Sequence, residues 1–270
     1  MAVASLTPDR FPRTSRYNPD WVRAGVSGGA NSLWLTEWLA EVMDLRPGMR
    51  VLDLGCGRGA SSVFLHLEYG VDVWATDLWF SADERWARIR DAGVGHHVSS
   101  VPADARRLPF PEGFFDAVLS IDAFGYFGTD DLYAGYLARF LRPGGQLGIA
   151  GAGLIRELDV DPPEHLRAWW EPSMACLHSA SWWQRHWARS GVLTIDVADT
   201  MPDGWRAWLD WQRAASPDNH LEINALSADR GEFLGYVRAV ARRRADIVPE
   251  EPIISIPVTY VAAPVLRAAG

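Results

Sequence analysis

The chain alternates short apolar runs with segments in which apolar residues recur at helical spacing. Runs with the length of buried strands lie at residues 49–54, 71–76, 97–101, 115–121 and 146–150. Helical spacing is found at residues 31–43, 61–69, 82–91 and 130–141. Strands separated by helices of about three turns predict βαβ units, and therefore a parallel sheet covered by helices on both faces.

The pattern is less regular after residue 151. It predicts a helix at residues 182–190 and a strand at residues 192–198. Residues 203–245 look mostly helical, with an apolar stripe from Phe233 to Ala241, although Gly231 and Gly235 weaken it. We expect a last, antiparallel strand at residues 253–261, with residues 234–242 as the alternative.

Composition and charge narrow the class of protein. The 270 residues are 48% hydrophobic and 22% charged, which is typical of a soluble globular chain. The net charge of −8 disfavours nucleic acid as a partner, because phosphate binding needs a basic surface. No signal-peptide core or membrane-spanning apolar run is present, and two cysteines fit a reducing cytoplasm. Residues 1–20 are expected to form an arm of low order.

A glycine-rich turn follows the first predicted strand. Residues 51–59 read VLDLGCGRG, and a helix is expected directly afterwards. Such a turn exposes backbone N–H groups, and glycine allows a ligand to approach the backbone closely. The spacing Gly55-x-Gly57-x-x-Ala60 also satisfies the dinucleotide fingerprint. Taken alone, the turn leaves open a structural role, a nicotinamide or flavin site, or a site for another cofactor.

Further motifs follow the other predicted strands. Asp53 lies two residues before Gly55, and Asp77 ends the second strand, where a carboxylate can accept both ribose hydroxyls. Asp104 follows the third strand, flanked by alanines. The fourth strand ends in Ser120-Ile121-Asp122, and Leu-Arg-Pro-Gly-Gly at residues 141–145 precedes the fifth.

This ordered set resembles the class I S-adenosylmethionine-dependent methyltransferases over about residues 30–150. The resemblance implies an α/β fold: a Rossmann-like, seven-stranded, mostly parallel sheet with helices on both faces and a helical, aromatic cap inserted after strand 5. It implies a transferase of the EC 2.1.1 class that uses S-adenosyl-L-methionine and releases S-adenosyl-L-homocysteine. The cofactor-binding residues that it implies are Asp53, Gly55, Gly57, Gly59, Asp77, Leu78, Asp104, Ala105 and Ser120.

The resemblance also implies roles and a division of the chain. The glycines would hold the methionine portion of the cofactor, Asp77 the ribose, and Asp104 with the backbone of Ala105 the adenine. Asp53 would orient the loop or reach the cofactor amino group through water. Residues 1–270 would form one domain, in which 1–45 make an N-terminal lid, 46–151 bind the cofactor, and 152–270 supply the acceptor-side cap and the last strands.

A narrower resemblance is to a bacterial branch of small-molecule methyltransferases. It rests on residues 31–35, 75–79 and 178–187. Relatives carry a histidine before the Tyr-Phe that follows the fourth strand, whereas this chain has Gly125 at that position. The function of that histidine therefore does not transfer to this protein.

The acceptor side offers several candidates for a general base. His178, Asp122 and Tyr126 are the predicted catalytic residues, and His165 and His186 are weaker candidates. His178 is preferred because it lies in an irregular stretch that should overhang the carboxyl edge of the sheet, where such folds bind ligands. The sequence shows no metal-ligand cluster, so no metal is expected.

The 14 tryptophans have two interpretations. They either pack in the core or form an aromatic wall for a small acceptor that is aromatic, apolar or amine-bearing, such as a secondary metabolite. Trp169-Trp170 and Trp182-Trp183 fall in the predicted cap. A cofactor-binding module without turnover and an NAD(P)-dependent oxidoreductase remain alternatives. An RNA or protein methyltransferase is disfavoured, and oligomeric state stays open.

Overall fold

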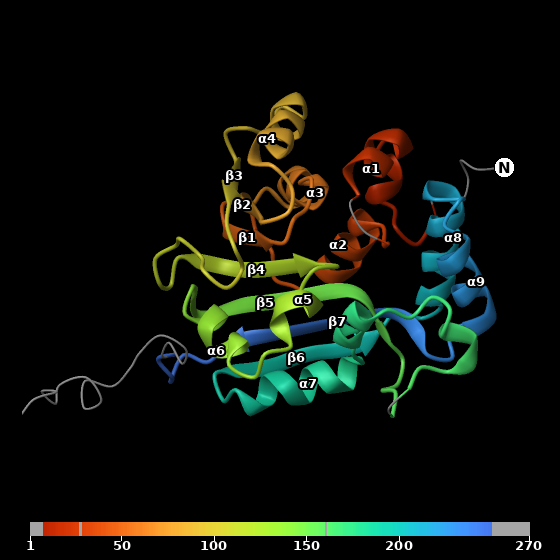
Figure 1. Ribbon diagram of the computed structural model, residues 1–270. Helices are drawn as coiled ribbons and strands as arrows, with labels where there is room; N and C mark the ends of the chain where they lie inside the picture. Colours follow the sequence, from red (N-terminus) through yellow and green to blue (C-terminus); the bar gives the residue numbers. More distant parts are fainter. Residues whose placement is uncertain (1–7, 27–28, 160, 250–270) are drawn as a thin grey trace, which may run out of the picture.

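A seven-stranded sheet forms the centre of the molecule in the computed structural model, which describes residues 8–26, 29–159 and 161–249 (Figure 1). The strand order is β3-β2-β1-β4-β5-β7-β6, and β7 runs antiparallel to both of its neighbours while the other pairs are parallel. The strands are β1 (Arg50–Leu54), β2 (Asp72–Asp77), β3 (Val98–Pro102), β4 (Phe115–Ile121), β5 (Leu141–Leu154), β6 (Leu193–Thr200) and β7 (Leu234–Arg243). The expected Rossmann-like, mostly parallel sheet is confirmed.

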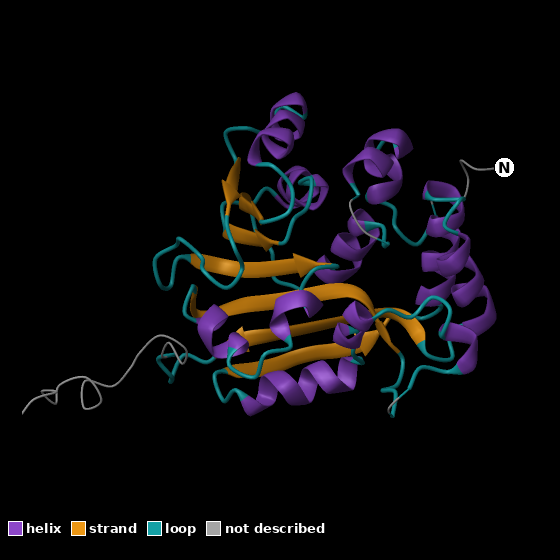
Figure 2. Ribbon diagram, viewed as in Figure 1, coloured by secondary structure: helices purple, strands orange, loops and turns teal. Residues whose placement is uncertain are grey.

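Helices cover both faces of the sheet (Figure 2). One core joins the sheet to α2 (Ser32–Ala40), α3 (Ala60–Tyr69), α4 (Ala82–Asp91), α8 (Gly204–Ala215) and α9 (His220–Asp229). The other core contains the residues of α6 (Tyr133–Ala138) and α7 (Ala180–Arg189). The short helices are α1 (Pro19–Gly25), α5 (Gly125–Gly128), η2 (Thr14–Arg16), η3 (Glu164–Leu166) and η4 (Pro172–Cys176). Apolar strands with both faces buried therefore separate two cores.

The seventh strand is the alternative that the sequence left open. β7 occupies Leu234–Arg243 and lies between β5 and β6, whereas residues 253–261 lie outside the described residues. The helical interpretation of the stripe from Phe233 to Ala241 is wrong. The first eight residues of β7, beginning at Leu234, are all buried. The strand therefore lacks the alternation of apolar and polar positions by which a strand is recognised in a sequence.

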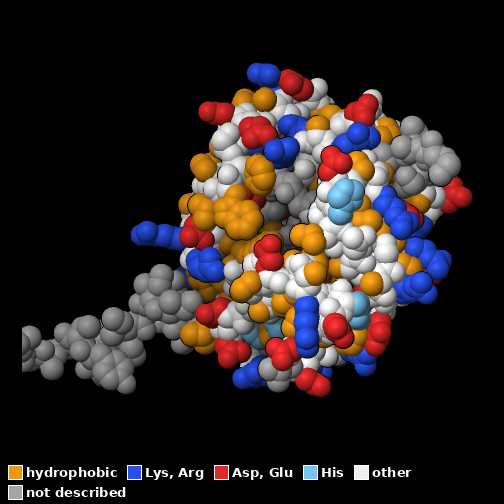
Figure 3. All heavy atoms as spheres, turned by 45° about the vertical axis from the view of Figure 1, so that its right-hand side comes forward, with side chains coloured by type: hydrophobic (Ala, Val, Ile, Leu, Met, Phe, Trp, Pro, Cys, Tyr) orange, Lys and Arg blue, Asp and Glu red, His pale blue; other side chains and the backbone are white. Residues whose placement is uncertain are grey.

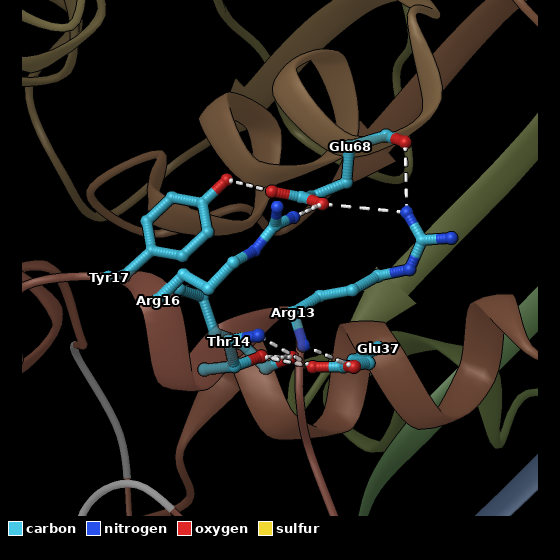
Figure 4. A network of polar contacts seen from close by, with 7 residues as sticks. Arg13, Thr14, Arg16, Tyr17, Glu37 and Glu68 are labelled. Carbon is cyan, nitrogen blue, oxygen red and sulfur yellow. Dashed lines mark hydrogen bonds and ion pairs between the residues drawn. The ribbon is translucent and has the colours of Figure 1, made fainter.

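The N-terminal segment is fastened to α2 and α3 by buried polar contacts (Figure 4). Glu37 of α2 accepts hydrogen bonds from the backbone N–H groups of Arg13 and Thr14, at 2.9 and 2.7 Å, and from the Thr14 hydroxyl. Glu68 of α3 pairs with Arg13 and accepts from the Tyr17 hydroxyl at 2.9 Å. Because these contacts involve residues far apart in sequence, the expected arm of low order is wrong for residues 8–20.

Two insertions cover the carboxyl end of the sheet. The first, between β5 and β6, contains η3 and η4, which belong to the expected cap after strand 5, and α7, which packs on the face of β6. The second, between β6 and β7, contains α8 and α9, and it also supplies walls of the cavity described below. Within the described ranges, no helix has the length and apolar character needed to cross a membrane.

Candidate cofactor and acceptor site

A cavity of about 540 Å³ lies at the carboxyl ends of the parallel strands. Figure 3 shows hydrophobic side chains gathered around a hollow on this face of the molecule. Of the predicted cofactor and catalytic residues, the lining includes Gly55, Gly57, Asp77, Leu78, Asp104, Ala105, Asp122 and Tyr126. The structure thus brings together motifs from the ends of β1, β2 and β4 and from the loop after β3.

The glycine loop owes its shape to three residues with positive φ. Gly55, Gly57 and Gly59 have φ of +76°, +55° and +81°, a region that favours glycine. A Cβ on Gly55 would lie 2.6 Å from the Cβ of Ala123, so the end of β4 also requires glycine there. Gly59 does not line the cavity; it is the N-cap of α3, and a Cβ on it would lie 2.9 Å from Arg85. Of the three, Gly55 and Gly57 line the cavity.

Asp53 connects the end of β1, just before the glycine loop, to the first turn of α3. Its Oδ2 accepts hydrogen bonds of 2.6 Å from the hydroxyls of Ser61 and Ser62 in the first turn of α3. Complete burial raises the pKa of Asp53 to about 6. Because its side chain is absent from the cavity lining, the geometry favours a role in orienting the loop over contact with the cofactor amino group.

Ser120 departs from the prediction. Its hydroxyl donates a 2.7 Å hydrogen bond to the carbonyl of Leu54, and its side chain is fully buried between β4 and β1. Ser120 is not among the described lining residues of the cavity. The expectation that it contacts the cofactor directly is therefore wrong. Asp122, two residues further along the chain, lines the cavity instead.

Asp77 is placed to hold both the loop and a ligand. Its Oδ2 accepts from the backbone N–H of Gly57 at 2.8 Å, and its Oδ1 accepts from the N–H groups of Trp79 and Phe80 at 2.8 and 3.0 Å. Each carboxylate oxygen has two lone pairs. The three backbone N–H groups use three of these four sites, which leaves one lone pair of Oδ2 for a ribose hydroxyl.

The loop after β3 supplies the third contact region. Asp104 Oδ1 accepts from the backbone N–H of Arg106 at 2.9 Å, and the carbonyl of Ala105 accepts from the Tyr133 hydroxyl at 2.9 Å. Both Asp104 and Ala105 line the cavity. A carboxylate here can accept from the amino group of an adenine, so the residues present fit S-adenosylmethionine.

Asp122 is the most unusual carboxylate in the cavity. It has a positive φ of 53°, rare for a residue other than glycine, and it accepts hydrogen bonds from the backbone N–H groups of Ala152, at 3.0 Å, and Ala30. Burial raises its pKa to about 6. Tyr126 lines the same cavity with its ring 5.2 Å from that of Trp79, and burial raises the pKa of its hydroxyl.

His178 does not reach the cavity. Its Nδ1 lies 2.9 Å from Glu157, and its ring stacks on Trp182 at 3.6 Å between centroids. It is not among the described lining residues, because the irregular stretch turns its side chain toward Glu157. His165 and His186 are likewise absent from that lining: His165 pairs with Asp229, and His186 bonds to the carbonyl of Gly128. The expected approach of His178 to the site is therefore wrong.

Gly125 leaves room for the loop that carries Cys176. A Cβ on Gly125 would lie 3.1 Å from both the carbonyl oxygen and the Sγ of Cys176. A histidine at this position would require that loop to move, which gives a packing reason for the departure from the family pattern.

The acceptor side of the cavity is formed by tryptophans and one residue that sequence reasoning missed. Trp169, Trp183 and Trp208 line it, whereas Trp182 does not. Glu222 lines it too, and its carboxylate accepts 2.7 Å hydrogen bonds from Trp208 Nε1 and Asn219 Nδ2. The sequence does indicate that Glu222 is buried. It precedes the apolar residues 225 and 226 by three and four positions, so it shares their buried face of α9.

One cluster with metal-ligand chemistry was also missed. His66, Asp72 and His97 offer ligand atoms within 4.8 Å of one another. Asp72 begins β2, whereas the cavity lies at the carboxyl end of that strand, and none of the three is among the described lining residues. The expectation of no ligand cluster is wrong, but the cluster stands apart from the cavity.

The chain is similar in sequence to known methyltransferases. Residues 52–149 match the family model of a methyltransferase domain. Methyltransferase GfsG of Streptomyces halstedii is 35% identical over 126 residues, 46% of this chain and 45% of the relative. A 27-O-demethylrifamycin SV methyltransferase of Amycolatopsis mediterranei is 28% identical over 77% of this chain and 82% of the relative. This chain thus spans less than half of the first relative's length.

Solved structures share the fold. Geranyl diphosphate C-methyltransferase from Streptomyces coelicolor A3(2) has a TM-score of 0.63 at 23% identity, over 77% of this chain and 78% of that one. The strand order, the glycine loop and the carboxylates at one cavity define a Rossmann-like protein built for a nucleoside cofactor. Residues 52–149 are a methyltransferase domain, and the fold around them is that of the class I S-adenosylmethionine-dependent methyltransferases.

Proposed function

We propose that this protein transfers a methyl group from S-adenosylmethionine to a small-molecule acceptor. One observation supports this most: a single cavity is lined both by the cofactor motifs of β1, β2 and β4 and by the tryptophan-rich insertions. Cofactor and acceptor can therefore lie against each other within one cavity, which is what methyl transfer requires.

The chain's own residues would hold the cofactor at named atoms. Gly55 and Gly57 present their backbone to its methionine portion, Asp77 accepts from the ribose, and Asp104 accepts from the adenine, with Leu78 and Ala105 alongside. When bound, S-adenosylmethionine supplies a methyl group on a positively charged sulfur, and the electrons of the methyl–sulfur bond leave with that sulfur as the acceptor's lone pair forms the new bond. The protein mainly aligns and shields the reactants.

Asp122 is the residue that would take a proton from the acceptor. It lines the cavity with its carboxylate held by the N–H groups of Ala152 and Ala30, and a pKa of about 6 suits a base that works near neutral pH. Tyr126 would orient the acceptor from the same side. His178 is not the base in this proposal, because its ring faces Glu157.

The relatives support a small acceptor. The first ones found include a methyltransferase named for 27-O-demethylrifamycin SV and one named for 2-methyl-6-phytyl-1,4-hydroquinone. A secondary metabolite that is aromatic, apolar or amine-bearing fits the tryptophan walls. In this proposal, residues 1–270 work as one domain in the cytoplasm, where free Cys56 and Cys176 would stay reduced, without a nucleic-acid partner or a catalytic metal.

The test must detect both cofactor binding and transfer. The fold is also that of the [4+2]-cyclase SpnF, with a TM-score of 0.60 at 18% identity, so fold alone does not decide the reaction. Calorimetry should show binding of S-adenosylhomocysteine, and mass spectrometry with labelled cofactor should reveal a methylated product in a metabolite panel. Binding without any product would favour a cofactor-binding module. A nicotinamide fluorescence change without S-adenosylhomocysteine affinity would favour an oxidoreductase.

A further inference from the structure

One part of the cavity wall combines two indole rings with a carboxylate. The rings of Trp169 and Trp208 meet edge to face, with centroids 6.0 Å apart and an interplanar angle of 72°. Trp208 Nε1 donates to Glu222 at 2.7 Å, and all three residues line the cavity. A Cβ on Gly29 would lie 2.9 Å from Glu222 Oε1, so the glycine leaves that oxygen free of a side chain from this direction.

The carboxylate of Glu222 lacks a counter-charge. It is 8% exposed, and its hydrogen-bond donors, Trp208 and Asn219, are neutral. Among the described residues, no cationic side chain forms an ion pair with Glu222 or with Asp122. Burial and the negative charge of Asp122 both raise the pKa of Glu222, so the two carboxylates interact with each other.

The cavity offers little positive charge to offset them. Arg106 is the one arginine of its described lining, and it donates through Nη2 to the carbonyl of Tyr126. Elsewhere in the described ranges a buried acid can have its partner: Asp229, which is 3% exposed, lies 3.0 Å from His165 Nε2. The carboxylates of Glu222 and Asp122 therefore have no cationic side chain beside them in the described lining of the cavity.

We propose that this corner is a binding site for a positively charged amine, and that the acceptor carries such a group. The cation would lie against the indole rings of Trp169 and Trp208, with Glu222 as its counter-ion. A buried carboxylate gains from an opposite charge, and cations bind aromatic rings most strongly where water is excluded. An anionic acceptor would meet two carboxylates and is disfavoured. The identification of the amine as part of an acceptor rests on the proposed function.

A pair of probes with equal shape and different charge tests this site. Choline carries a quaternary ammonium that cannot be methylated further, and 3,3-dimethylbutan-1-ol is its neutral carbon analogue. We expect choline to bind the full-length protein about tenfold more tightly than the alcohol. Ligand-observed NMR titrations, with and without S-adenosylhomocysteine, measure both affinities. Equal affinities, or no binding of choline, would overturn the proposal.

Two variants test whether Glu222 and Trp169 form the binding site for the cation. Glu222→Gln should lower choline affinity by about tenfold while the affinity for the alcohol holds. Trp169→Leu should also reduce the preference for the cation, and it keeps the test decisive where Glu222→Gln fails to fold. Glu112→Gln is the matched control, because Glu112 is exposed, pairs with Arg139 and does not line the cavity. A preference retained in Glu222→Gln would refute the counter-ion role.

The two proposals fail separately. Binding of S-adenosylhomocysteine to the wild-type protein without a preference for choline removes the amine site and leaves methyl transfer standing. A preference for choline without any affinity for S-adenosylhomocysteine retains the cation site and removes the proposed function.

Discussion

The carboxylate of Asp77 accepts a 2.8 Å hydrogen bond from the backbone N–H of Gly57, which ties the end of β2 to the glycine loop at the end of β1. One side chain therefore sets the position of the backbone that faces the cavity, and it keeps one lone pair of Oδ2 for a ribose hydroxyl. Loss of this carboxylate should affect the affinity for the cofactor twice, through the direct contact and through the loop.

Asp77→Ala should weaken S-adenosylhomocysteine binding by at least about tenfold. Hydrogen bonds to a charged group contribute roughly 1.5–3 kcal/mol each, and about 1.4 kcal/mol corresponds to a factor of ten. Calorimetry measures the change. Asp72→Ala is the matched control, because Asp72 begins the same strand at its far end. Unchanged affinity in Asp77→Ala would remove Asp77 from the site.

Much of this architecture was predictable because its signals are local. The glycine loop and Asp77 adjoin strongly apolar strands, and β4 lies where the sequence placed it, at residues 115–121. β7 was harder, since burial on both faces removes the alternation that distinguishes a strand from a helix. The side-chain direction of His178 could not be predicted either, because no periodicity determines direction in an irregular stretch.

The acceptor side depended on contacts between distant parts of the chain. Trp208 on α8 and Glu222 on α9 lie in residues 152–270, which the sequence assigned to the acceptor-side cap, but the sequence did not identify Glu222 as a lining residue. Ala30 and Ala152 meet at the carboxylate of Asp122 from elements that are more than a hundred residues apart in sequence. Local sequence patterns do not predict contacts between residues that are so far apart in the chain.

Asp122→Asn should lower the rate of methyl transfer by about 10²–10⁴-fold while S-adenosylhomocysteine affinity holds. A base with a pKa of about 6 is deprotonated above that pH, so the wild-type rate should fall as pH falls through about 6. Carbon NMR titration of the carboxyl groups should show two resonances that titrate near pH 6, those of Asp53 and Asp122, and one of them should disappear in Asp122→Asn. A full rate in that variant would mean that the acceptor reacts without this base.

His178→Ala should lower stability and leave the rate per folded molecule unchanged. The substitution removes the stack on Trp182 and the hydrogen bond to Glu157, contacts that together contribute on the order of 1–2 kcal/mol. Thermal unfolding measures the first effect, and turnover normalised to folded protein measures the second. A large loss of turnover with unchanged unfolding would return His178 to the catalytic residues.

Asp53 should make the protein more stable toward mildly acidic pH. Its folded-state pKa of about 6 exceeds the ordinary value of 3.8, so the folded state binds more protons than the unfolded state between these values. The free energy of unfolding should therefore decrease as pH rises through this window. In denaturant titrations, Asp53→Asn should reduce the dependence of the free energy of unfolding on pH. Part of the dependence should remain, because the pKa of Asp122 is also raised. An unchanged slope would contradict the raised pKa of Asp53.

Chelation of divalent metals should leave methyl transfer intact. The His66, Asp72 and His97 cluster is the one group with metal-ligand geometry in the described part of the chain, and it is not part of the described cavity lining. His66 Nδ1 already lies 2.9 Å from the carbonyl of Val71, and His97 Nδ1 lies 2.8 Å from Asp72, so both rings have structural partners. Turnover should be equal in EDTA and in added magnesium, and His97→Ala should retain the wild-type rate. Activity lost in chelator and restored by magnesium would show that a metal takes part, and its loss in His97→Ala as well would place that metal at this cluster.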